Sequence, residues 1–215
     1  MPIKLTKENL SIATIWLFHV SGILGMLYGN SDWFISATPL NLLISFVLLL
    51  LNSKGHKWFF PMAFIAFLVG MISEILGVQF GWIFGNYQYG EQLGYKVLGV
   101  PLMIGVNWAM LTIITGAIAH QFYENTFMRI IIGVTLMLLL DLLIEPVAPR
   151  LDFWVFDGGE APLQNYVGWG LVALCLQFGY HFLKIKVESG FPNHLYLLQI
   201  IFFTVLLIKQ TTIGL

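Results

Sequence analysis

Seven stretches of nearly unbroken apolar residues alternate along the chain with short polar segments. A helix that crosses a bilayer core of roughly 30 Å needs about 20 such residues. The runs are continuous, without the in-and-out alternation of membrane β-strands, which excludes a β-barrel. We therefore predict an all-α, polytopic membrane bundle of about seven transmembrane helices, forming one domain over residues 1–215. The predicted spans are 10–28, 35–51, 58–80, 100–120, 129–146, 165–183 and 193–211.

Composition supports this class, because 58% of the residues are hydrophobic and 10% are charged, against about 25% charged residues in soluble domains. The net charge of −1 and the lack of a basic tract make nucleic acid a poor partner. Cys175 is the only cysteine, so disulfides and cysteine-based metal or haem motifs are excluded, and we interpret it as a small core residue. No small-residue cleavage site follows the first apolar run, which we expect to be a retained span rather than a signal peptide.

The distribution of basic residues predicts how the bundle is oriented. With seven spans, seven basic residues fall on the side of the N-terminus and three on the other. The first group is Lys4, Lys7, Lys54, Lys57, Arg129, Lys184 and Lys186, and the second is Lys96, Arg150 and Lys209. We therefore expect a multi-pass protein of the cell membrane (the inner membrane of a bacterium) with a cytoplasmic N-terminus. The long loops 81–99 and 147–164 then face outward.

Three acidic residues, Glu74, Asp141 and Glu145, lie inside the predicted spans. A carboxylate at membrane depth costs roughly 2.5–3.5 kcal/mol on insertion scales, so such residues suggest a functional site. All three lie near the outer ends of their spans, within roughly 10 Å of the same face at 1.5 Å per residue. Asp141 and Glu145 are four residues apart and share one helical face. The three carboxyl groups are therefore predicted to converge.

A weak internal repeat surrounds these acids. Pro, Leu, Val and Trp recur at identical spacing in 101–108 and in 162–169, each time where a span begins. Each segment follows an intramembrane acid and a loop rich in aromatic residues. Sites in membrane proteins often lie at the interface between repeats. The acid precedes the proline by 27 residues in one copy and by 17 in the other, so any duplication is either old or illusory.

The two aromatic loops supply the other candidate site residues. They are Trp82, Phe84, Tyr87, Tyr89, Trp108, Trp154, Asn165, Tyr166 and Trp169. Two structural alternatives remain open: an aromatic belt at the membrane surface with glycine-mediated packing, and an ion pair of Arg150 with Asp141 or Glu145. Pro146 is expected to end the fifth span directly after Glu145.

The residue types suggest acid chemistry on an alkene. Burial among aromatic side chains and a second carboxylate nearby both favour a protonated carboxyl group, which can protonate a carbon–carbon double bond. Ring faces and a neighbouring carboxylate would stabilise the carbocation, and that carboxylate could also orient or deprotonate a water molecule. Hydration, isomerisation or cyclisation of a polyene lipid would use these groups.

Other classes fit less well. Asp141 and Glu145 resemble the acidic helices of membrane prenyltransferases, but a second acidic motif and the basic residues for a diphosphate are missing. A metal site of the three carboxylates is a further alternative. The histidines are scattered, and we interpret them as packing or interfacial residues. Lys209 in the last span lies too near the helix end to favour a retinal Schiff base.

At these residues the chain resembles a known family, the membrane carotenoid-biosynthesis proteins of the bisanhydrobacterioruberin hydratase type. The resemblance covers roughly residues 60–180 and rests on five groups of residues. They are Glu74-x-x-Gly77-Val78, Gly81-x-x-Phe84-Gly85-x-Tyr87-x-Tyr89, Gly99-Val100-Pro101-Leu102 with Trp108, Asp141 with Glu145-Pro146 and Trp154, and Asn165-Tyr166-Val167-Gly168-Trp169. It implies addition of water to the terminal double bond of an acyclic carotenoid end group, giving a tertiary alcohol, without a cofactor.

We therefore expect a carotenoid hydratase, a hydro-lyase without metal or organic cofactor, whose partners are a lycopene- or γ-carotene-like substrate, water and the bilayer. Association with other carotenoid enzymes is a further expectation. Glu74 or Asp141 is expected to be the general acid and Glu145 the group that handles water. The alternatives are a cyclase or isomerase that uses the same cation, and a carotenoid- or lipid-binding protein or transporter without catalysis.

Overall fold

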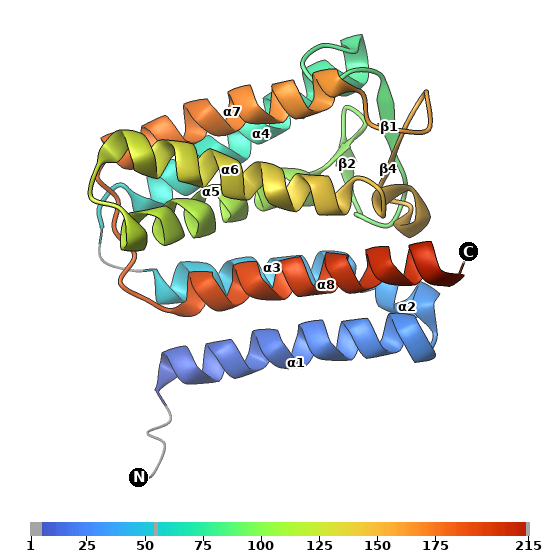
Figure 1. Cartoon of the computed structure of the whole chain (residues 1–215), viewed down its shortest axis with the longest axis horizontal. Helices are drawn as coiled ribbons and strands as arrows, with labels where there is room; N and C mark the ends of the chain where they lie inside the picture. The colour runs from blue at the N-terminus through green and yellow to red at the C-terminus, as the bar shows by residue number, and fades with distance from the viewer. Residues whose placement is uncertain (1–5, 54–55, 214–215) are drawn as a thin grey trace.

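A computed structural model shows an elongated bundle whose long helices lie roughly along one common axis (Figure 1). The structure describes residues 6–53 and 56–213, so Lys4 and Lys54 of the orientation argument lie outside the described residues. The helices are α1 Lys7–Tyr28, α2 Ser31–Ser36, α3 Thr38–Asn52, α4 Phe59–Phe80, α5 Leu102–Phe122, α6 Thr126–Ile144, α7 Leu163–Phe182 and α8 Phe191–Ile213. Short strands β1 Tyr87–Tyr89, β2 Lys96–Val97, β3 Val100–Pro101 and β4 Trp154–Phe156, and a 3₁₀ turn Ala148–Leu151, complete it.

The predicted all-α class of an integral membrane protein is confirmed. Within the described residues five helices, α1, α4, α5, α6 and α8, are long and apolar enough to cross a membrane. Helix α7 also has 20 residues but is not among these five, and α3 has only 15. The prediction of one helix over residues 35–51 was wrong. The chain breaks between Ser36 and Thr38, because Pro39 cannot continue a preceding helix and instead occupies the first turn of α3.

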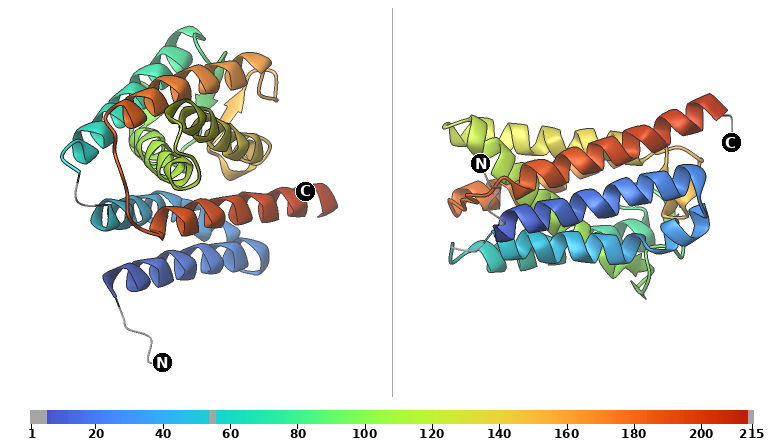
Figure 2. Two further views of the ribbon diagram at one scale, coloured as in Figure 1. Left: turned by 60° about the vertical axis from the view of Figure 1, so that its left-hand side comes forward. Right: turned by 90° about the horizontal axis from the view of Figure 1, so that it is seen from below.

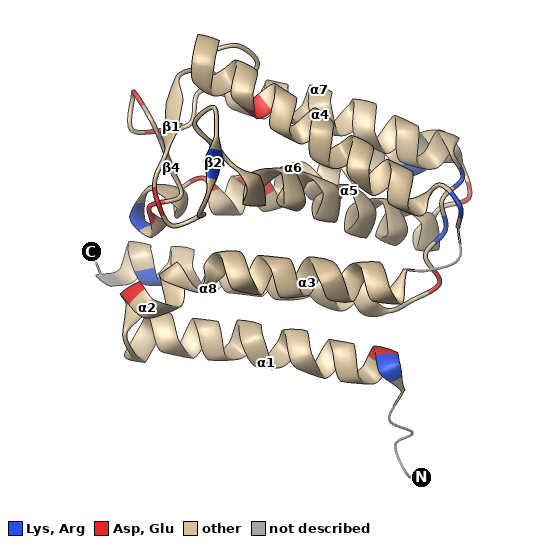
Figure 3. Ribbon diagram, turned by 180° about the vertical axis from the view of Figure 1, so that it is seen from behind, with Lys and Arg blue, Asp and Glu red and all other residues tan. Residues whose placement is uncertain are grey.

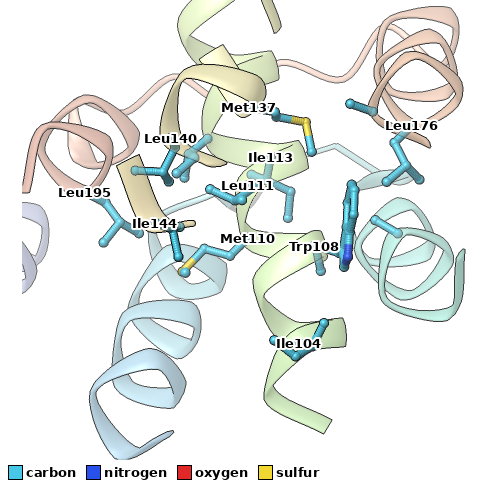
Figure 4. Packing of buried hydrophobic residues seen from close by; sticks show 14 of the residues in the cluster. Ile104, Trp108, Met110, Leu111, Ile113, Met137, Leu140, Ile144, Leu176 and Leu195 are labelled. Atoms are coloured by element: carbon cyan, nitrogen blue, oxygen red, sulfur yellow. The ribbon is translucent and has the colours of Figure 1, made fainter. Parts of the chain in front are cut away.

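The helices form three layers. Helices α4 to α7 make one group, α3 and α8 lie against it, and α1 covers α3 and α8 from the other side (Figures 1 and 2). Helix α5 lies at the centre, with 78% of its most apolar window buried. Its residues Trp108, Leu111 and Ile113 pack among side chains of the surrounding helices, including Met137 and Leu176 (Figure 4). A helix that is apolar all round, as α5 is, belongs in such an interior.

Local signals explain where the helices begin and end. Thr6 and Asn125 accept hydrogen bonds from backbone N–H groups in the first turns of α1 and α6. Gly81 ends α4 in the left-handed conformation, with φ of 67°. Helix α6 ends at Ile144, which confirms the helix end predicted from Pro146. The interpretation of Cys175 as a core residue was wrong, because its position on α7 is exposed on the surface of the bundle.

The strands gather at one end of the bundle, called here the strand end. Strand β1 pairs antiparallel with β4, and β2 pairs with β3. The β2–β3 turn places Leu98 and Gly99 at φ of 49° and 84°, as a two-residue hairpin turn requires. Figure 3 shows most Lys and Arg positions on the ribbon at the two ends of the bundle, with few charged positions along the helices between them.

The pairing of β1 with β4 joins the two predicted repeats. One unit is α4, β1 and α5, and the other is α6, β4 and α7. Pro101 and Pro162 are the residues that precede the first turns of α5 and α7. Because the strands pair antiparallel, the two units meet face to face at the strand end. This is the interface at which the candidate acids lie.

Candidate active site

Glu74 is held by three hydrogen-bond donors inside the bundle. It lies on α4 and is 3% exposed. Its Oε2 atom accepts from the Tyr87 hydroxyl at 2.5 Å and from the Tyr89 hydroxyl at 2.7 Å, and its Oε1 accepts from Trp108 Nε1 at 2.9 Å. Both tyrosines come from β1, where alternate residues point to one face of the strand. Three donors on one carboxyl group stabilise its charged form.

Two glycines on α4 allow this approach. A Cβ atom on Gly77 would lie 2.7 Å from the Tyr87 hydroxyl oxygen, and one on Gly70 would lie 2.5 Å from Trp108 Cγ. Contacts under 3.0 Å force a neighbour to shift. The rings that bind Glu74 therefore rest directly on the backbone of α4. This explains why glycine stands one turn before and nearly one turn after the acid.

Glu145 has its own pair of donors in the second repeat. It caps the end of α6 and is 6% exposed. Its Oε2 accepts from Trp154 Nε1 at 3.0 Å, and its Oε1 accepts from Asn165 Nδ2 at 2.6 Å. Trp154 belongs to β4 and Asn165 to the first turn of α7. Each repeat thus holds one glutamate with a tryptophan N–H and donors from its own strand or next helix.

The two glutamates line one small cavity. Trp108 and Trp169, which are equivalent in the two repeats, stack with ring centroids 4.0 Å apart and form part of its wall. The cavity measures about 20 Å³, and one water molecule needs roughly 10–15 Å³ by the same measure. Its wall consists of Glu74, Tyr87, Tyr89, Ile104, Asn107, Trp108, Ile144, Glu145, Trp154, Phe156, Asn165 and Trp169.

The two tyrosine hydroxyls act as donors at any ordinary pH. Burial, and then the negative charge of Glu74, raises the pKa of Tyr87 far above its usual value. The same two causes raise the pKa of Tyr89. Each phenol therefore keeps its proton and donates it in a hydrogen bond. The group that each hydroxyl faces must then be an acceptor. The carboxyl oxygens of Glu74 supply the acceptors for both hydroxyls and for the Trp108 N–H.

Asp141 is buried but stands apart from this cavity. It is 1% exposed, and neither carboxyl oxygen has a hydrogen-bond partner among the described residues. It lies one helical turn before Glu145 on α6. The structure therefore brings Glu74 and Glu145 together at one cavity and leaves Asp141 beneath it, without a donor and outside the cavity wall.

The other predicted residues divide into three groups. Tyr87, Tyr89, Trp108, Trp154, Asn165 and Trp169 line the cavity with the two glutamates. Phe84 is buried behind the wall, where its ring packs against the rings of Tyr87 and Trp108. Trp82 is 60% exposed and points away from the site. Tyr166 is half-buried and lines a different cavity, described next.

An open cavity of about 450 Å³ lies on the other side of Glu145. Its wall includes Glu145, Arg150, Glu160 and Tyr166, and it is open to the surroundings at the strand end. Glu145 is the residue that this cavity shares with the small one. It therefore lies between the two spaces.

Arg150 does not form the ion pair that was considered from sequence. It is exposed, and the salt bridge found within the described residues joins Lys96 to Glu91. The two glutamates are thus held by neutral donors. Within residues 6–53 and 56–213, no group of three His, Cys, Asp or Glu side chains is arranged to hold a metal ion.

Four wall residues were not predicted: Ile104, Asn107, Ile144 and Phe156. Asn107 offered a signal, because it is a polar residue in an apolar span directly before Trp108. Phe156 lines the cavity because it pairs with Tyr87 across the two strands. That register was not predictable from the residues of either loop alone.

Comparison with known proteins places the chain in a family. A family described as "Carotenoid biosynthesis protein" matches residues 34–213. Bisanhydrobacterioruberin hydratase of Haloarcula japonica is 32% identical over 119 residues, which cover 50% of this chain and 41% of that protein. The alignment thus spans about two fifths of the length of this relative. No solved structure matches the chain.

Proposed function

Because the chain belongs to the family of carotenoid biosynthesis proteins, we propose that it hydrates the terminal double bond of an acyclic carotenoid end group. The family membership confirms the resemblance inferred from sequence and assigns the protein to carotenoid biosynthesis. The activity of the hydratase relative comes to this chain as a proposal. The observation that carries it is the cavity with room for one water molecule between two buried glutamates.

The proposed reaction adds the elements of water in two steps. A carboxylic acid gives its proton to the less substituted carbon of the terminal double bond, and the tertiary carbon is left as a cation. The rings of Trp108, Trp169 and Trp154 present electron-rich faces to this cation. The enclosed water then attacks it, and the proton that this water loses passes to a carboxylate. The product is a tertiary alcohol, and the acid is restored because the carboxylate that takes the proton of the water is the one that gave the first proton.

The hydrogen bonds suggest a division of roles that differs from the one expected from sequence. Glu74 accepts from three donors and borders only the enclosed cavity. We assign it the role of the permanent carboxylate, which stabilises the cation and orients the water. Glu145 accepts from two donors and also borders the open cavity. We assign it the role of the proton donor, which regains its proton from the attacking water.

The end group itself needs more space than this cavity offers. Trp154 and Tyr89 are the aromatic wall residues that are only half-buried, and we propose that they move when substrate enters. The remainder of the polyene lies in the membrane alongside the helices. On the distribution of basic residues, we propose that the strand end faces the exterior and that the N-terminus is cytoplasmic.

The decisive experiment is expression in a host that makes lycopene or γ-carotene, followed by mass analysis of the pigments. We expect a product heavier than its parent by one water, and no such product from the Glu145→Gln variant at equal membrane abundance. A product of unchanged mass would identify a cyclase or isomerase instead. Bound but unchanged carotenoid would identify a binding protein, and either result would refute hydration.

A further inference from the structure

A second and larger cavity lies beside the proposed active site. It measures about 220 Å³ and is enclosed by α1, α2, α3 and α8, in the region where α1 covers the other two long helices (Figure 2). Its walls are mainly apolar and aromatic, with Phe18, Phe34, Phe202 and Phe203 among them. A cavity of this kind suits an apolar ligand.

Five polar side chains interrupt these apolar walls, and three of them, Gln199, Asn41 and His19, offer acceptor atoms to a ligand. Gln199 of α8 is 5% exposed, and its Oε1 atom has no hydrogen-bond partner among the described residues. The same holds for Oδ1 of Asn41. His19 of α1 directs Nδ1 at the Ile15 carbonyl oxygen, 2.8 Å away, so in the neutral ring Nε2 is left as an acceptor. All three residues line the cavity.

Such unpartnered groups are costly unless a ligand satisfies them. A buried polar atom without a partner costs about 1–3 kcal/mol, and buried polar groups in proteins are nearly always paired. Acceptor atoms need a donor, and a hydroxyl group supplies one while it also accepts from a side-chain amide. The complementary ligand is therefore an apolar molecule that carries one hydroxyl group.

A single aromatic residue separates this cavity from the proposed active site. Phe153 lines the larger cavity, and Trp154, the next residue, lines the small one. Their ring centroids are 6.2 Å apart. Phe153 directly precedes β4, and the two neighbouring rings together form a partition between the two spaces. A modest movement of Phe153 would join them.

From this juxtaposition we infer that the larger cavity binds the hydroxylated end group of a carotenoid, the product of the proposed hydration. This inference rests on the proposed function for the source of the hydroxyl group. The new tertiary alcohol leaves the small cavity past Phe153, and its hydroxyl group donates to one of the acceptors of Gln199, Asn41 and His19 and accepts from a side-chain NH₂ group of Gln199 or Asn41. Its methyl-bearing carbons pack against the phenylalanine rings.

Binding by purified protein in detergent tests this directly. The probes are a 1-hydroxylated acyclic carotenoid and its parent without the hydroxyl group. Binding of each is measured by the quenching of tryptophan fluorescence. We expect Gln199→Leu to weaken the hydroxylated ligand about tenfold (~1.4 kcal/mol) and to leave the parent unchanged. Leu197→Ala, on the exposed face of the same helix, is the control and should bind both as the wild type does.

A second variant guards against misfolding of the first. Gly22 lines the cavity, and a Cβ atom there would meet Phe202 only at an ordinary 3.5 Å, so Gly22→Leu is expected to fold and to fill the space. It should reduce binding of the hydroxylated ligand at least tenfold. Equal affinity in wild type and both variants would overturn the inference.

The result is separable from the fate of the proposed function. Wild-type protein that forms no hydrated product in cells, yet binds the hydroxylated carotenoid in a Gln199-dependent manner, would refute the hydratase and support the cavity. Protein that hydrates its substrate but binds the alcohol equally well with Leu at position 199 would refute the cavity and support the hydratase.

Discussion

Replacing Glu74 by glutamine and by leucine separates the charge of this residue from its hydrogen bonds. The glutamine side chain has the same shape, and its amide oxygen can accept from Trp108 Nε1 as Oε1 does in the native protein. Its NH₂ group then faces the hydroxyls of Tyr87 and Tyr89, which can rotate and accept. We expect Glu74→Gln to fold with a stability within about 1 kcal/mol of the wild type.

Leucine leaves all three donors without a partner. The indole N–H of Trp108 can only donate, so the loss of its acceptor alone costs about 1–3 kcal/mol of stability. The two phenols of Tyr87 and Tyr89 lie in the same buried space and add to this cost unless they rotate toward each other. We therefore expect Glu74→Leu to lose roughly 3 kcal/mol or more of unfolding free energy.

Activity should follow the charge and not the stability. If the carboxylate of Glu74 stabilises the cation, its removal in Glu74→Gln should lower the rate about 10²–10³-fold, or ~2.7–4 kcal/mol of transition-state stabilisation. The assay is the ratio of hydrated to parent carotenoid per amount of protein in the membrane, combined with thermal unfolding in detergent. Glu91→Gln changes an exposed glutamate, which pairs with Lys96, and should be active.

Two results would refute this reasoning. A glutamine variant that keeps more than a tenth of the activity would show that the negative charge of Glu74 has no role in catalysis. A glutamine variant as unstable as the leucine variant would show that Tyr87, Tyr89 and Trp108 form a structural network that requires a carboxylate. The second result would leave the proposed roles of the two glutamates without support.

Three further predictions follow from the same geometry. Asp141→Asn should keep at least tenfold more activity than Glu145→Gln, because Glu145 lines the cavity and Asp141 does not; equal losses in the pigment assay would contradict this. Gly77→Ala should cost about 1–3 kcal/mol in thermal unfolding by displacing a tyrosine ring, whereas Gly170→Ala, with its nearest contact at 3.7 Å, should be neutral or stabilising. The raised pKa of Tyr87 favours the neutral phenol in the folded state, so its contribution to stability is present below pH ~10 and lost above it; Tyr87→Phe should show a smaller fall in melting temperature between pH 9 and 11.

Much of this architecture could be predicted because lipid imposes strict rules on a chain. A bilayer requires long apolar helices, and the apolar runs located every long helix. The short helix α2 was not predicted as a separate element. Depth in the membrane and four-residue spacing also predicted that the acids would lie near one another. The burial of Glu74 and Glu145 at one cavity follows that reasoning. Their partners Tyr87, Tyr89 and Trp154 were predicted from residue type alone.

Rotation and register could not be predicted from one sequence. Trp82 follows directly after Gly81, whose left-handed conformation turns the chain away from the site, and its ring is exposed. Asp141 shares a helical face with Glu145, yet one turn along α6 it lies outside the cavity wall. The position of Phe156 depends on the pairing of β4 with β1. These outcomes are decided by contacts between segments that lie far apart in the sequence.

The repeat explains why a cavity for a single water molecule forms where it does. Two similar units that meet face to face bring equivalent residues together, and Trp108 accordingly stacks on Trp169. Each unit also carries its own glutamate to the same interface, where burial is greatest and donors come from both strands. The units have diverged in one respect, because Glu74 has two tyrosine donors while Glu145 has an asparagine and reaches the open cavity. Two carboxyl groups with equal surroundings would compete for one proton, whereas unequal donors let the two groups differ in proton affinity.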